Sequence, residues 1–199
     1  MPPSTHEGSA VHPSRTPEPP EPPGGILAQL RADHARIHAM FHAFAMLDDE
    51  DDAGREALVD DLCDELALHA MLEEELFYPA LRGVVEDSLL DDAALEHDSA
   101  HELIVQLETL FPGDDFFNAT VAVLAEEVAH HLAREENLLF PALARTGADQ
   151  VALGLRLRER RAQLVADLAS PPPVIDGAEP RGLLRGQPGG PRERRSRPR

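Results

Sequence analysis

The sequence has 199 residues and a formal net charge of −19, and its single cysteine, Cys63, excludes an intrachain disulfide and fits a reducing compartment. Between residues 26 and 169, ten Arg stand against thirty-one Asp and Glu, a balance that repels nucleic acid and anionic membranes. With no secretory signal pattern and no apolar run of about 18 residues, we predict a cytoplasmic protein whose folded part binds neither nucleic acid nor membrane.

The two ends of the chain differ in composition from the middle. Residues 1–25 and 170–199 are rich in Pro and Gly and poor in apolar side chains, so they are predicted to be disordered. The second tail carries seven Arg that could contact an anion, although a solvated tail without a partner is favoured. One domain remains, with a bundle over residues 26–146 and an additional helix over residues 147–169.

Helical periodicity runs through the middle of the chain, and no alternating strand pattern interrupts it. The first helix is predicted over residues 26–47, where DDEDD breaks the pattern. The second begins after Asp51 and Asp52, which suit the N-cap position, and reaches about residue 82.

Three more helices follow in the predicted order. The third begins at Ser88, where SLLD fits a capping box, and reaches about residue 110. The fourth spans residues 115–145 and stops before Gly147, and the fifth spans residues 148–169. Short connections between long helices predict an all-α fold: an up-down-up-down four-helix bundle with an extra C-terminal helix and disordered tails.

The second and fourth helices contain a repeat. HAMLEEELFYPAL begins at His69 and HLAREENLLFPAL begins at His131, and seven of the thirteen positions are identical. Each copy has a proline two residues before its end, Pro79 or Pro141, which lacks an N–H and is expected to kink its helix near one end. The equivalent positions of the two breaks indicate that the halves of the bundle arose by duplication.

The duplication includes paired histidines and acids. The first and third helices hold DHARIH and EHDSAH, so each half reads acid-His-x-x-x-His and then His-x-x-x-Glu-Glu. Side chains four residues apart share one helix face, and in the second and fourth helices this face is also the apolar one. Buried carboxylates need compensating positive charge, so we predict metal cations between the helices.

A simpler interpretation is a set of structural histidines, because one buried histidine in a bundle is more often structural than a metal ligand. Eight of the ten histidines lie in or beside these recurring motifs, however, and this favours the metal site. The neighbouring acids Glu74, Glu75 and Glu136 are predicted to be a solvated face.

The ligand types restrict the metal. Imidazole and carboxylate without thiolate suit Fe, Mn or Zn. A ferritin-like centre uses Glu-x-x-His, whereas this chain has the reverse order and more imidazole than carboxylate. The sequence therefore argues against a ferritin-like oxidase.

The motifs HAMLEEELFYP and HHLAREENLLFP resemble those of the hemerythrin-like (HHE cation-binding) domains, over about residues 26–146. The resemblance implies two Fe ions inside the bundle, joined by an oxo or hydroxo bridge and two carboxylates. Matched motif by motif, it implies two bridging carboxylates, Glu73 and Glu135, and five imidazole ligands, His34, His69, His97, His101 and His131.

This ligand set implies one closed, six-coordinate iron and one five-coordinate iron with an open position for a small ligand such as O₂. The oxygen carriers of the family place an Asp five residues after the last histidine, but here Glu135 lies five residues after His130 and four after His131. The repeat favours His131, and His130 remains the alternative. His38 is either an additional ligand or a residue beside a ligand, and Tyr78 either packs at the kinked helix end or hydrogen-bonds a ligand.

Three functions are compatible with this sequence. The favoured one is binding or sensing of a small ligand, which would be O₂, another diatomic or iron itself. The alternative is a diiron enzyme that consumes peroxide or nitric oxide, and the third is a helical interaction module with a structural metal. We predict no catalytic residue, favour a binding protein over an enzyme, and name no protein partner.

Overall fold

The structure, a computed structural model, describes residues 21–169. The predictions for residues 1–20 and 170–199, including the arginines of the second tail, lie outside this part. Within residues 21–169, no helix combines the length and the apolar character needed to cross a membrane.

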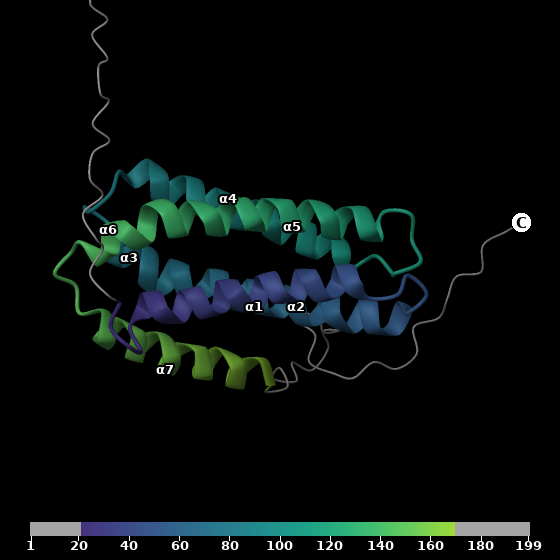
Figure 1. Ribbon diagram of the computed structural model, residues 1–199, viewed down its shortest axis with the longest axis horizontal. Helices are drawn as coiled ribbons and strands as arrows, with labels where there is room; N and C mark the ends of the chain where they lie inside the picture. The colour runs from purple at the N-terminus through teal and green to yellow at the C-terminus, as the bar shows by residue number, and fades with distance from the viewer. Residues whose placement is uncertain (1–20, 170–199) are drawn as a thin grey trace, which may run out of the picture.

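Four long antiparallel helices form a bundle, and a fifth helix lies along its outside (Figure 1). The bundle consists of α1 (Ile26–Met46), α2 (Asp52–Leu72), α4 (Asp87–Leu107) and α5 (Phe117–Arg134). The outer helix α7 (Gln150–Ala169) packs against α1 and α2. The predicted all-α class and the bundle with an extra helix are confirmed.

The helix starts test the predicted capping residues. Asp51 is the N-cap of α2, and its side chain accepts a hydrogen bond from the backbone N–H of Gly54 at 3.0 Å, as expected. The capping box at Ser88 is wrong, because α4 already begins at Asp87 and its N-cap residue, Glu86, makes no side-chain capping bond.

Both repeats contain a short π-helix, which the helical periodicity of the sequence does not predict. After α2 and α5 the chain continues without a break through two pairs of short elements, η1 (Glu73–Phe77) and α3 (Tyr78–Leu81), and η2 (Glu135–Leu139) and α6 (Phe140–Ala144). The backbone N–H of Tyr78 donates to the carbonyl of Glu73, five residues back instead of four.

The prolines explain this change of hydrogen bonding. A proline ring clashes with the carbonyl four residues earlier and has no N–H to offer it, and a wider turn relieves both problems. The same wide turn, from Phe140 to Glu135, precedes Pro141. The predicted kink is thus a π-turn, and each π-helix begins at a predicted ligand, as π-turns at functional sites often do.

The apolar core consists of two clusters that flank the predicted site. On α1, Leu30 belongs to one cluster and Ile37 to the other, and His34 lies between them. On α2, Leu66 and Leu72 flank His69 in the same way. The histidines therefore occupy a polar layer between two apolar layers.

Helix α7 packs against the start of α1 and is hydrogen-bonded to it. Gly154 lies so close to the backbone of Gly24 that a Cβ atom there would collide with it. The side-chain N–H of Gln29 donates to the carbonyls of Gly24 and Gly154, both at 2.9 Å. Leu157 and Leu164 bury the apolar face of α7 in the first cluster. A helix outside the bundle thereby becomes part of its core.

Candidate metal centre

The structure brings together six of the seven predicted metal ligands. They come from α1, α2, α4, α5 and the two π-helices, and they are His34, His69, Glu73, His97, His131 and Glu135. His97 is half-buried and the other five are buried. The i,i+4 spacing within the repeats thus does place histidine and glutamate on the inner face.

These residues form two groups that could each hold a metal ion, and Glu73 belongs to both. The first group is His34, His69, Glu73 and Glu135, and the second is Glu73, His97 and His131, each with ligand atoms within 4.8 Å of one another. The Oε2 atom of Glu73 lies 3.3 Å from His69 Nε2 and 3.4 Å from His97 Nε2. One carboxylate therefore reaches histidines of both groups, which is the geometry of a bridge.

Glu135 has a similar reach. Its Oε2 atom lies 3.3 Å from His34 Nε2 and 3.7 Å from His131 Nε2, so it also connects the two groups. The Nε2 atoms of His97 and His131 approach to 3.1 Å, so the two rings point at the same place.

Unpartnered polar atoms indicate what the centre is built to hold. Within the described residues, both carboxylate oxygens of Glu73, Oε2 of Glu135 and Nε2 of His34 and His69 are buried without a hydrogen-bond partner. Leaving such groups unsatisfied costs about 1–3 kcal/mol each, and metal ions coordinated by these atoms would remove the cost. The donor set therefore fits a pair of metal cations.

Further carboxylates pair with the other ring nitrogen, Nδ1, of these histidines. The Nδ1 atoms of His34, His97 and His131 each pair at 2.9 Å with a carboxylate, Glu136, Glu74 and Glu96 respectively, and Asp33 lies 3.9 Å from Nδ1 of His69. An acceptor at Nδ1 fixes the tautomer and leaves Nε2 for the metal.

The prediction that Glu74 and Glu136 form a solvated face is confirmed for their exposure but does not account for their contacts. Both carboxylates remain partly exposed, but each orients a histidine of the opposite half of the repeat. Glu75, in contrast, does lie on the surface, where it pairs with Arg160 of α7. The signal that could have revealed these pairs is the recurrence of acid-His and Glu-Glu at equivalent positions of both halves.

Protons occupy this layer when no metal is bound. Burial alone would lower the pKa of His34, but the carboxylates of Glu135 and Glu73 outweigh it and raise the pKa to about 10. Burial likewise opposes the charge on His131, and Glu73 and Glu135 raise its pKa to about 9. Protons and metal ions therefore compete for the nitrogens of these imidazoles, so metal binding must release protons.

The pKa values of the two central carboxylates, Glu73 and Glu135, shift in opposite directions. Burial would raise the pKa of Glu73, but the surrounding histidines, His69 first among them, hold it well below its usual range. Burial and the nearby charge of Glu73 raise the pKa of Glu135. Two carboxylates that share one buried site do not both ionise without added positive charge, which two metal ions would supply.

Tyr78 hydrogen-bonds a predicted ligand, one of the two roles left open by the sequence. Its hydroxyl donates to Glu135 Oε1 at 3.0 Å and lies 3.2 Å from His97 Nε2. Burial and then the negative charge of Glu73 and Glu135 raise the pKa of Tyr78 far above its ordinary value. The phenol therefore keeps its proton and acts as a donor to the carboxylate.

We expect the Tyr78→Phe variant to bind metal roughly 10- to 100-fold more weakly, the usual cost of removing a hydrogen bond to a metal ligand. The ring stays in place, so packing against Phe77 is retained. Competition with a chelator of known affinity measures the change. An affinity equal to that of the unaltered protein would show that the hydroxyl does not support Glu135.

Three predicted positions lie outside both groups. His38 is exposed on α1, and His130 is exposed on α5 with 70% of its side-chain surface accessible, whereas His131 is buried. His101 is also exposed, because it lies one turn, about 5 Å, beyond His97 along α4. This displacement takes its side chain past the level of the glutamates and into the wall of a neighbouring pocket.

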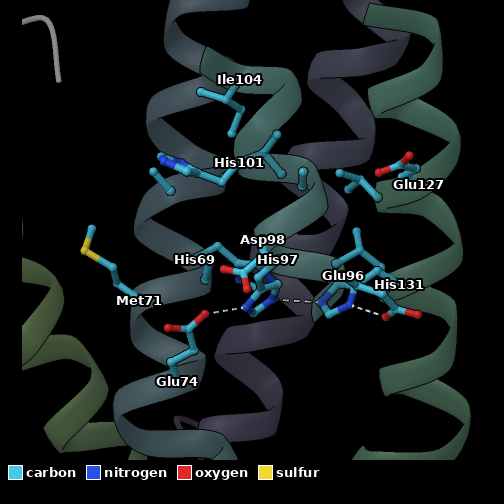
Figure 2. Close-up of a pocket in the computed structure, with 16 residues that line it drawn as sticks. His69, Met71, Glu74, Glu96, His97, Asp98, His101, Ile104, Glu127 and His131 are labelled. Atoms are coloured by element: carbon cyan, nitrogen blue, oxygen red, sulfur yellow. Dashed lines mark hydrogen bonds and ion pairs between the residues drawn. The ribbon is translucent and has the colours of Figure 1, made fainter. Parts of the chain in front are cut away.

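That pocket leads from the surface to the centre. It lies between α2, α4 and α5, and three of the six clustered residues, His69, His97 and His131, form part of its wall (Figure 2). The remainder of the wall includes apolar side chains such as Leu66, Ile104 and Val128. A small molecule can therefore approach the second group from one side of the bundle.

A salt-bridge network joins α7 to the histidine layer. Asp33, which is buried beside His69, pairs with Arg36 at 3.1 Å and closely with Arg161 of α7. Arg161 also pairs with Glu65 of α2 at 3.3 Å. One arginine of the outer helix thus neutralises the carboxylate that faces Nδ1 of His69.

We expect Arg161→Gln to lower the free energy of unfolding by roughly 1–3 kcal/mol, because Asp33 keeps a buried charge with one partner fewer. The matched variant is Arg160→Gln, which removes only the surface pair with Glu75 and should leave the unfolding midpoint nearly unchanged. Urea denaturation of both variants measures the difference. Equal midpoints would show that the contact with Asp33 contributes no more than a surface pair.

Comparison with known proteins gives one family match. The sequence matches the family described as the Hemerythrin HHE cation binding domain over residues 25–152. A curated relative, a DNA nickase of Nostoc sp. (strain PCC 7120 / SAG 25.82 / UTEX 2576), is 25% identical over 114 residues, which are 57% of this chain and 32% of that protein. The chain therefore spans about a third of the length of this relative.

A solved structure has the same arrangement of helices. It is a Hemerythrin HHE cation binding domain-containing protein of Mycobacterium kansasii, an Rv2633c homolog, and the TM-score is 0.64. The sequences are 22% identical, and the alignment covers 72% of this chain and 89% of that one. At this identity the likeness establishes the fold.

Proposed function

This chain belongs to the family of hemerythrin HHE cation-binding domains, and we propose that it holds two iron ions and binds a small ligand such as O₂ at an open position beside them. His34 and His69 would hold one ion, and His97 and His131 the other. Glu73 and Glu135 would be shared, since each reaches histidines of both groups.

The chemistry of the donors supports iron. Mixed imidazole and carboxylate donors suit Fe(II) and Fe(III), and a bound pair of irons supplies redox chemistry and positions for a small ligand. The chain contributes the orientation of the ligands. Carboxylates accept hydrogen bonds from the Nδ1 atoms of His34, His97 and His131 and so fix the orientation of these rings. Tyr78 donates a hydrogen bond to Glu135.

The observation that carries the proposal is the pocket that ends on His69, His97 and His131. Each group offers two imidazoles and, with Glu135 3.7 Å from His131, a share of two carboxylates, which is fewer than the six donors of a closed octahedral iron. A reactive metal site keeps a free position with access to solvent, whereas a structural site is closed. An incomplete donor set beside an open pocket favours ligand binding over a structural metal.

The first experiment is metal analysis of the purified full-length chain, followed by titration of the reduced protein, freed of excess reductant, with O₂ while the absorption spectrum is recorded. We expect about two irons per chain, as the two groups require, and a reversible spectral change with O₂. One zinc per chain, or no metal after iron loading, would overturn the proposal in favour of the structural module.

An enzyme that consumes peroxide or nitric oxide is the second candidate, and His101 is the observation that favours it. Such reactions need a group that exchanges protons with solvent close to the reacting atoms. His101 lies in the wall of the pocket, one turn from His97, and its side chain is exposed. It could therefore transfer protons without holding the metal.

Turnover separates the two candidates. Iron-loaded protein mixed with hydrogen peroxide or nitric oxide would consume many equivalents per chain if it is an enzyme and no more than about one equivalent per centre if it is a binding protein. In the enzyme case, His101→Asn should slow turnover while the iron content stays the same. A loss of iron in this variant would instead return His101 to the metal ligands.

A further inference from the structure

The two groups of ligands differ in their access to solvent. We call the group of His34, His69, Glu73 and Glu135 the inner position and the pair His97 and His131 the outer position. All four side chains of the inner position are at most 3% exposed, whereas the side chain of His97 is 9% exposed. Both histidines of the outer position line the pocket, but only one histidine of the inner position does so. Solvent therefore reaches the outer position more directly.

Arginines hold three of the four carboxylates that face an Nδ1 atom. The inner position has two such carboxylates, and both are held. Arg31 Nη1 lies 3.2 Å from Glu136, and Asp33 pairs with Arg36 at 3.1 Å and closely with Arg161. The imidazoles of the inner position are thus supported by carboxylates that have fixed places of their own.

The outer position has one carboxylate that an arginine holds and one that none holds. Behind His131, Glu96 pairs closely with Arg134. Behind His97, Glu74 reaches Nδ1 at 2.9 Å (Figure 2), but within residues 21–169 it forms no ion pair with an arginine. The side chain of Glu74 is also 49% exposed. His97 therefore has the least firmly held support of the four histidines.

The duplication shows which residue is missing. Arg31 lies three residues before His34, and the equivalent position, three residues before His97, is Ala94. An aromatic ring stacks on each of these two histidines, at centroid distances of 5.2 Å and 5.6 Å, so the surroundings are otherwise repeated. The second half thus has the carboxylate and the aromatic ring of the first half without its arginine.

A weakly held supporting carboxylate lets a histidine leave its metal ion more readily. Partners behind a ligand fix the orientation of its ring, and their loss typically costs about 10- to 100-fold in metal affinity. At His97 this weak support coincides with exposure and with the pocket. The ligand that can turn away most easily is thus also the one beside a path to solvent.

We propose that the outer position exchanges its ion with the surroundings through the pocket, while the inner position retains its ion. This inference rests on the proposed pair of irons and adds which of the two is exchangeable. The inner group includes both Glu73 and Glu135, so it keeps four donor residues after the outer ion has left.

The test is removal of iron from the loaded full-length chain by an excess of a colour-forming Fe(II) chelator without oxygen, with the absorbance recorded over time. We expect two phases of equal amplitude, one ion in each. Their rates should differ at least roughly tenfold, the lower end of the effect of partners behind a ligand. Release of both ions at one rate would overturn the inference.

Ala94→Arg supplies the arginine that the second half lacks. It should slow the fast phase roughly two- to fivefold, the range expected for one exposed ion pair, and leave the slow phase unchanged. The control is Ala122→Arg, which adds the same charge at an exposed position of α5 and should change neither phase. An equal effect of both variants, or no effect of Ala94→Arg, would contradict the role given to the support of His97.

A second pair of variants tests the path. Ala100 lines the pocket, so Ala100→Phe narrows it and should slow the fast phase, whereas Ala122→Phe should not. Thermal unfolding of both variants confirms that they are folded. A fast phase that is unchanged in folded Ala100→Phe would place the path elsewhere and refute exchange through the pocket.

Metal analysis before the chelator is added keeps this result separate from the proposed function. Fewer than two irons per chain would refute the proposed function and this inference together. Two irons that leave at the same rate would refute the exchangeable position alone and leave the proposed pair of irons intact.

Discussion

Replacement of Glu73 by Gln is expected to remove most of the bound metal from the protein. Glu73 is fully buried, belongs to both groups of ligands, and both of its oxygens lack a hydrogen-bond partner. An amide keeps the shape but loses the charge and one metal-binding oxygen, so neither ion retains its set of donors. The affinity should fall by more than the 10- to 100-fold typical of changes at residues behind the ligands.

The same run of glutamates provides the control. Glu75→Gln is the identical substitution two residues later, where the side chain is exposed and pairs with Arg160. It should leave about two metal ions per chain, measured by elemental analysis after dialysis. Metal content that is equally high in both variants would exclude Glu73 as a shared ligand.

The metal-free protein is expected to lose stability as the pH rises from about 6.5 to 10. The carboxylates raise the pKa of His34 to about 10 and that of His131 to about 9, whereas an unfolded histidine titrates near 6.5. A raised pKa means that the protonated folded form is stabilised. Its contribution is complete below about pH 6.5 and disappears as the pH passes the folded values.

Metal ions should reverse this dependence. They replace the protons on the histidines, so binding becomes tighter as the pH rises through the same interval. Thermal unfolding of the metal-free and metal-loaded full-length chain should therefore give midpoints that diverge from pH 6.5 to pH 9. A metal-free midpoint that is constant or rising over this interval would contradict the expected proton occupancy.

Variants of two neighbouring histidines show whether the loss of stability with rising pH comes from the metal centre or from the rest of the protein. His131→Gln should flatten the decline, because this ring is buried beside Glu73 and Glu135. His130→Gln should leave it unchanged, since that ring is exposed and only approaches Glu96 at 3.8 Å. The pair also tests which of the two histidines belongs to the centre.

The local pattern of the sequence was sufficient for the fold and for most of the centre. Apolar spacing of 3.6 residues and polar breaks predicted the helices of the bundle and α7. The repeated His-x-x-x-Glu placed His69, Glu73, His131 and Glu135 on the inner face, where the structure has them. Spacing along one helix is a local property, so it can be read without knowledge of the neighbouring helices.

Contacts between helices could not be read in this way. The acids Glu74 and Glu136 look like surface residues in sequence, and only the approach of η1 to α4 and of η2 to α1 turns them towards His97 and His34. His101 lies four residues after His97, the spacing expected of a second ligand on the same helix face. Its position along α4, however, is one turn beyond the glutamates, so its side chain lines the pocket instead.

The sequence by itself determined an acidic all-α bundle with a duplicated set of imidazole and carboxylate donors, because periodicity and spacing act within single helices. The tertiary structure alone decided which acids support which histidines, how α7 reaches Asp33, and where a pocket opens onto the centre. These features depend on the relative height and rotation of packed helices, which the sequence of one helix does not specify.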